Sequence, residues 1–135
     1  MGNLPIMGVK EMVGGQILHS KFKEGIMRYS PDYYTNLKKR YPKVTKSFDA
    51  LAADCSAAGP LDEKTQRMVK LGVAIGRGVE GDIQNLAMQA LAEGITPDEV
   101  RHAVLLSVTT AGFPTMIASM QLVEEIIAQL TTRPS

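Results

Sequence analysis

Apolar residues recur three and four positions apart in one segment after another, and this helical spacing is the feature that most restricts the fold of the chain. No segment alternates apolar and polar residues convincingly over the length of a strand, so a sheet has no obvious material. The sequence therefore predicts an all-α protein, a single domain built as an irregular bundle of five or six helices. The spacing is clearest in three sets: Val44, Phe48, Leu51, Ala52 and Cys55; Ile83, Leu86, Ala87, Ala90 and Leu91; and Met116, Ile117, Met120, Val123, Ile126, Ile127 and Leu130.

Start and stop signals predict where the helices begin and end. The strongest start is Thr96-Pro97-Asp98-Glu99, where Thr96 and Glu99 form a capping box ahead of a buried face of three valines. Further starts are Ser30-Pro31-Asp32 and Asp62, and a glycine after a helical stripe, such as Gly94, ends a helix in the left-handed conformation. Two further breaks between helices are predicted at Gly59-Pro60 and at Gly112-Phe113-Pro114. The helix that starts at Asp62 is predicted to pack through Met68, Leu71, Val73 and Ile75.

The first part of the chain is Gly-rich and weakly patterned. We predict an N-terminal arm over residues 1–28, with a short helix around Val9 to Val13, and one helical domain over residues 29–135. The 135-residue chain has a net charge of +1 with no basic stripe and no tryptophan, which argues against a nucleic-acid partner. Its longest apolar runs are too short to span a membrane and it starts with no leader signal, so a cytoplasmic location is expected.

Cysteine usage excludes several kinds of chemistry. Cys55 is the one cysteine of the chain, so an intramolecular disulfide, a C-x-x-C redox pair and a cysteine-rich metal site are excluded. We expect no cofactor and no metal, and we expect Cys55 to be a small core residue. The letters G-x-G-x-x-G over Gly76 to Gly81 follow a predicted helix rather than a strand, so we interpret them as a helix-to-helix joint and not as a dinucleotide turn.

Several of these segments occur together in a known order. Leu61 to Thr65, the apolar helix and glycine joint after it, Gln89 to Thr96 with Glu99, and Ala111 to Pro114 follow one another at matching spacing. Over residues 48 to 130 the chain resembles the carboxymuconolactone decarboxylase/AhpD-like family. The resemblance implies an all-helical bundle that assembles into homotrimers or homohexamers, with part of the stripe from Met116 to Leu130 between subunits.

Members of that family with peroxidase activity resemble one another in two features: a glutamate on the helix before the joint and the motif C-x-x-C-x-x-x-H on the helix after it. Arg67, Val79, Asp82 and Leu86 occupy those positions in this chain. Without the two thiols the usual thiol peroxidase mechanism is excluded. The decarboxylase branch resembles an acid/base enzyme with a histidine at the position of Leu86, and that histidine is absent too.

The residues left as candidates are Arg67, Asp82, Glu80 and His102. Arg67 and Asp82 are expected to face each other across two packed helices, as a structural ion pair or as an anion-binding or acid/base site, with simple exposure to solvent as the remaining alternative. Glu80 lies at the joint, and His102 is either a general base or a surface residue.

Two hypotheses follow from these candidates. The first is a cofactor-free lyase or isomerase that acts on a small carboxylated, lactone-like acid, with Arg67 binding the carboxylate and Glu80 or His102 moving protons. The second is a non-catalytic oligomer that kept the fold and binds a small molecule or a protein.

Overall fold

The computed structural model describes residues 31–131, which form six α-helices, one short 3-10 helix and no strand. The predicted all-α fold is confirmed. The predicted arm over residues 1–28 and its helix around Val9 lie outside the described residues. The elements in chain order are α3 (Pro31–Arg40), α4 (Pro42–Ala57), α5 (Glu63–Arg77), α6 (Glu80–Ala92), α7 (Pro97–Leu106), η1 (Ser107–Thr109) and α8 (Phe113–Thr131).

Helix ends follow the predicted signals closely. The Asp62 side chain accepts a hydrogen bond from the backbone N–H of Thr65 at the start of α5. At α7 the Thr96 hydroxyl accepts from the Glu99 amide at 3.1 Å, and the Glu99 carboxylate accepts from the Thr96 amide at 2.9 Å, which confirms the capping box. Gly94 has a φ of 94°, the left-handed conformation that a helix stop favours in glycine.

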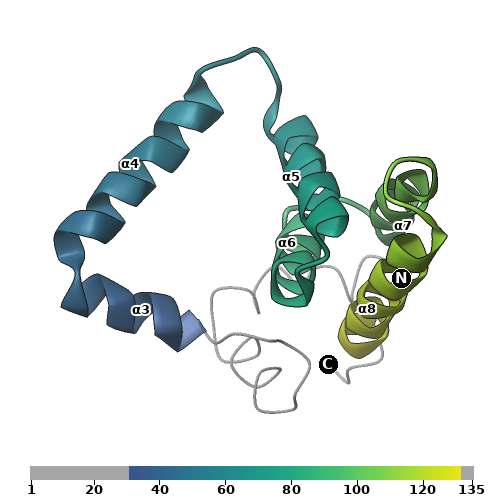
Figure 1. Ribbon diagram of the computed structural model, residues 1–135. Coiled ribbons are helices and arrows are strands. Elements are labelled where there is room, and N and C mark those ends of the chain that lie inside the picture. Colours follow the sequence, from purple (N-terminus) through teal and green to yellow (C-terminus); the bar gives the residue numbers. More distant parts are fainter. Residues whose placement is uncertain (1–30, 132–135) are drawn as a thin grey trace.

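The core lies among α5, α6, α7 and α8, and α6 is its centre. Helix α6 packs against both α5 and α8, and α7 packs along α8 (Figure 1). Leu71, Ile83 and Leu91 are almost fully buried there, as are Val100 and Val104 of the predicted valine face. The four helices therefore form one bundle whose core is made within a single chain.

One expectation about helix faces is corrected by this packing. Val73 is exposed, because it lies on the opposite side of α5 from Leu71 and Ile75. On α8, Met116, Val123 and Ile126 are buried in the core of their own chain, whereas Ile117 of the same stripe is exposed, so the placement of part of this stripe between subunits stays a prediction.

Helices α3 and α4 leave the bundle together, and we call them the α3–α4 arm, which is distinct from the predicted N-terminal arm over residues 1–28. Figure 1 shows α4 running away from the upper end of α5, and within the described residues its main packing partner is α3. Val44, Phe48 and Leu51 on its apolar stripe are 63%, 60% and 59% exposed. The prediction that Cys55 is a core residue is wrong, since this thiol lies on the same uncovered helix and is exposed. No helix in the described part of the chain is long and apolar enough to cross a membrane.

Candidate functional site

A pocket of about 780 Å³ opens where the end of α4, the start of α5 and the loop after α6 meet. Its volume lies within the range of small-molecule sites. The walls combine small side chains from α4 with a charged face from α5. The lining residues are Ala53, Ser56, Ala57, Glu63, Lys64, Gln66, Arg67, Lys70, Glu93, Gly94 and Ile95.

Arg67 is the predicted site residue that lines this pocket. Its Nε donates to the Glu93 carboxylate at 3.1 Å, its Nη2 donates to the other carboxylate oxygen, and its Nη1 donates to Gln89 Oε1 at 2.8 Å. The arginine side chain is 23% exposed and that of Glu93 is 46% exposed. This fork geometry is the strong form of an arginine–carboxylate pair, and it ties α5 to the end of α6.

The two lysines of the pocket differ in their partners. Lys64 is paired with Glu99, the capping-box glutamate of α7. That hydrogen bond, with help from the Thr96 amide, lowers the pKa of Glu99 to about 2. For Lys70, one turn beyond Arg67, no ion pair to another described residue is present. The pocket therefore offers one cation that can meet an added anion without breaking an existing pair.

Asp82 and Glu80 lie at the start of α6, beside the C-terminal end of α5 and away from the pocket. Asp82 accepts from Arg77 at 3.4 Å across the joint, and Glu80 is exposed at the first position of α6. The predicted Arg67–Asp82 pair is therefore wrong. Because α5 and α6 form an antiparallel hairpin that turns at Gly78, residues close to the turn contact each other, as Arg77 and Asp82 do. Residues far from the turn also contact each other, as Arg67 does with Gln89 and Glu93.

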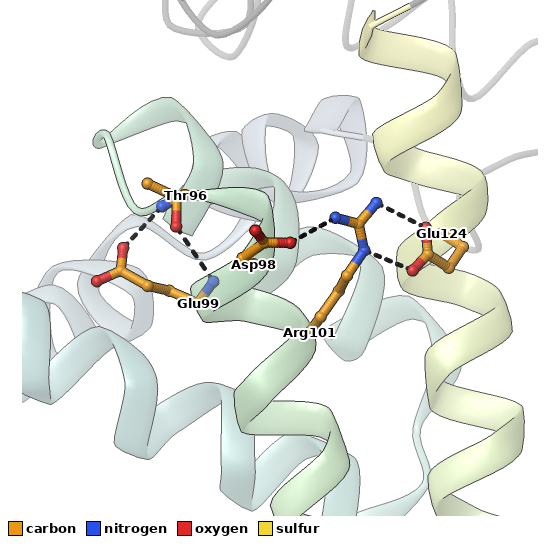
Figure 2. Close-up of polar contacts among 5 residues, drawn as sticks. All are labelled: Thr96, Asp98, Glu99, Arg101 and Glu124. Atoms are coloured by element: carbon orange, nitrogen blue, oxygen red, sulfur yellow. Dashed lines mark hydrogen bonds and ion pairs between the residues drawn. The ribbon is translucent and has the colours of Figure 1, made fainter. Parts of the chain in front are cut away.

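His102 is exposed on α7, outside the pocket lining. Its neighbour Arg101 carries the polar contacts of this helix: Nε and Nη2 donate to the Glu124 carboxylate at 2.6 and 3.0 Å, and Nη1 donates to Asp98 at 2.9 Å (Figure 2). The pair raises the pKa of Arg101 and lowers that of Glu124, mainly through their hydrogen bond. This contact joins α7 to α8 and is structural.

The described residues hold no group of three or more His, Cys, Asp and Glu side chains that could bind a metal ion. The glycine joint is also no nucleotide turn, because α5 remains helical through Arg77 and the left-handed Gly78 (φ 71°) simply ends it. The sequence interpretation of this motif as a helix joint is confirmed.

Three residues were not predicted from the sequence: Lys70 and Glu93, which line the pocket, and Gln89, which lies outside the lining and accepts a hydrogen bond from Arg67. A usable signal was present, because an antiparallel hairpin turning at Gly78 places a residue eleven positions before the turn opposite one eleven to fifteen positions after it. The same register places Arg77 beside Asp82, close to the turn. The four predicted site residues thus occupy three separate places, and the structure does not bring them together.

Comparison with known proteins gives one family. The model of the carboxymuconolactone decarboxylase family matches residues 42–125, well over half of the chain, and the match starts at the first residue of α4. The chain is also similar to the uncharacterized protein MJ0742 of Methanocaldococcus jannaschii, with 26% identity over 91 residues that cover 67% of this chain and 88% of that relative. No solved structure gives a significant match.

Proposed function

Since the chain belongs to the carboxymuconolactone decarboxylase family, we propose that it is a non-catalytic member that self-assembles and binds a small carboxylated molecule in the pocket between α4 and α5. One observation carries this proposal. Arg67, the candidate that lines the pocket, has its guanidinium engaged by Glu93 and Gln89, and the other three candidates lie elsewhere.

The case against catalysis is geometric. General acid/base chemistry needs a proton donor or acceptor within hydrogen-bond reach of the reacting atom. Glu80 and Asp82 begin α6, next to the C-terminal end of α5, and that end is about ten residues or 15 Å along α5 from Arg67. His102 is on α7, outside the pocket lining. No pair of these groups surrounds one reacting atom.

The case for binding rests on charge and size. Lys70 supplies an available ammonium, because the neighbouring cation of this face of α5, Arg67, is already paired with Glu93. Ala53 and Ala57 on the α4 wall leave space for an apolar body of the ligand. A carboxylate bound to Lys70, with its apolar part against α4, uses both walls.

Assembly and location complete the proposal. Homotrimers or homohexamers in the cytoplasm are the arrangement that we propose, supported by family membership and by the uncovered apolar stripe of α4.

The binding part is tested by thermal shift titration of the full chain with acetate, benzoate and succinate, each against its neutral amide. The carboxylates are expected to raise the melting temperature with concentration, and the amides are not. Lys70→Gln is expected to weaken binding about 10- to 100-fold, since a hydrogen bond to a charged group contributes about 1.5–3 kcal/mol. Lys46→Gln, an exposed lysine of α4 outside the pocket, is the matched control. Equal titrations of both variants would contradict the site.

A second candidate is the cofactor-free lyase or isomerase, favoured by the presence of Arg67 in a pocket of substrate size. In that function Arg67 holds the carboxylate of a lactone-like acid, and Glu80 or His102 moves the proton. The test follows carbon dioxide release and lactone consumption by the wild type, Arg67→Ala and Glu80→Gln. Turnover that is lost in Arg67→Ala would replace the non-catalytic proposal with this one.

A further inference from the structure

We propose that the apolar stripe of α4 in one copy packs on the α7–η1–α8 corner of a second copy, so that chains join head to tail. The inference rests on the self-assembly in the proposed function and names the surfaces that carry it.

The first surface is the α4 stripe, defined as Val44, Phe48 and Leu51. These side chains recur four and three positions apart on a 16-residue helix, and each is about three-fifths exposed. Helices of about this length are marginal in water unless a tertiary contact covers their apolar face. Helix α3 lies at the start of α4 and leaves these three residues uncovered.

The second surface is the corner patch, defined as Leu105, Leu106, Phe113 and Ile117. Leu105 and Leu106 end α7, Phe113 and Ile117 begin α8, and all four are between 47% and 60% exposed. Residues 103–123 include this whole corner and contain no charged side chain. Depletion of charge around exposed large apolar residues is the composition of an interface core.

The two surfaces of one chain lie too far apart to cover each other. Figure 1 shows α4 on one side of the molecule and α7 with α8 on the other, with α5 between them. Nor does α4 pack significantly against α7 or α8 in the described residues. A second copy is therefore the occupant that offers the corner patch to α4.

Net charge favours the bundle over a second arm as the partner of the α4 stripe, and the exposed apolar side chains then single out the corner patch within the bundle. Residues 31–57 contain five basic and three acidic residues, a net +2, whereas residues 62–131 contain five basic and nine acidic residues, a net −4. Packing arm on arm brings like charges together, and packing arm on bundle brings opposite charges together. Because the two joined surfaces differ, the contact is heterologous, and it closes into a ring when the rotation between copies allows.

The test measures the mass of the full chain in solution, by light scattering and sedimentation, for the wild type, Phe48→Glu and Phe113→Glu. The wild type is expected to have a multiple of the single-chain mass, and each variant the single-chain mass. Val73→Glu, equally exposed on α5 but outside both surfaces, is the control and is expected to keep the wild-type mass. Circular dichroism verifies the helical content, and Leu51→Lys with Ile117→Lys form a second pair of variants.

Mixing the two variants is the sharpest step. Phe48→Glu retains its corner patch and Phe113→Glu retains its α4 stripe, so the mixture is expected to form pairs of twice the single-chain mass. Assembly that survives in Phe113→Glu but not in Phe48→Glu would mean stripe-to-stripe packing and would overturn the proposal. A wild type of single-chain mass at every concentration would overturn it as well, and with it the proposed self-assembly. Loss of carboxylate binding with assembly intact counts against the pocket alone.

Discussion

The inner faces of the α5–α8 bundle and the apolar stripe of the α3–α4 arm have similar helical periodicity, yet the inner faces are covered and the stripe is not. In the bundle, Leu71 and Val104 are fully buried by neighbouring helices. In the arm, Phe48 and Leu51 follow the same three-and-four spacing and are mostly exposed. Periodicity therefore predicts that a helix has an apolar face, and only the tertiary arrangement determines whether that face is covered by the same chain.

The largest expected difference between the two regions is the response to core truncation. Leu71→Ala is expected to lower the free energy of unfolding by about 2–5 kcal/mol, because it leaves a cavity in the bundle. Leu51→Ala is expected to cost about 0.5 kcal/mol or less in dilute solution, where the arm is uncovered. Urea denaturation of both variants checks this. Equal losses at high dilution would show that α4 packs within its own chain.

Helix caps give the next contrast. Thr96→Ala removes the capping bond of α7 and is expected to cost about 1 kcal/mol. Tyr41, at the corresponding position of α4, makes no side-chain capping bond, so Tyr41→Ala is expected to change stability by no more than about 0.5 kcal/mol. Thermal denaturation of the pair measures the difference, and a larger loss in Tyr41→Ala would reverse the comparison.

Removal of an ion pair should also cost more stability in the bundle than in the α3–α4 arm, by a smaller amount than for the helix caps. Arg101→Met keeps the long stem and removes the fork to Glu124, with an expected cost of about 0.5–1 kcal/mol for this partly exposed pair. In the arm, Lys38 and Asp49 are 4.0 Å apart and both well exposed, so Lys38→Met is expected to be nearly neutral. High salt should reduce the first effect, and an equal cost of the two substitutions would contradict the comparison.

Acid should affect the bundle through Glu99. Its pKa is about 2 in the folded chain and 4.5 as the ordinary value, mainly because Lys64 donates a hydrogen bond to it. A lowered carboxyl pKa contributes stability above pH 4.5, and that contribution is lost as the pH falls from 4.5 through 2. Both Glu99→Gln and Lys64→Met should therefore make the unfolding free energy fall less steeply in this interval. An unchanged slope in both variants would rule out the Lys64–Glu99 contact as its source.

The fold was largely predictable from the sequence, because its helix ends depend on local chemistry. Thr96 and Glu99 cap one helix and Gly94 ends another, and neither feature needs a distant contact. The site was less predictable, since Arg67 could be paired correctly only from the register of the α5–α6 hairpin. The prediction that Cys55 is a core residue was wrong because helical spacing shows only that Cys55 lies on an apolar face of α4, and not whether another helix covers that face.

Hydrogen–deuterium exchange of the full chain at low and high concentration tests most directly whether the bundle is complete within one chain while the arm needs a second copy. Backbone amides of α4 are expected to exchange rapidly in dilute solution and to become protected as the concentration rises, whereas those of α6 stay protected throughout. Amides of α4 that are as protected as those of α6 at the lowest concentration would contradict the account.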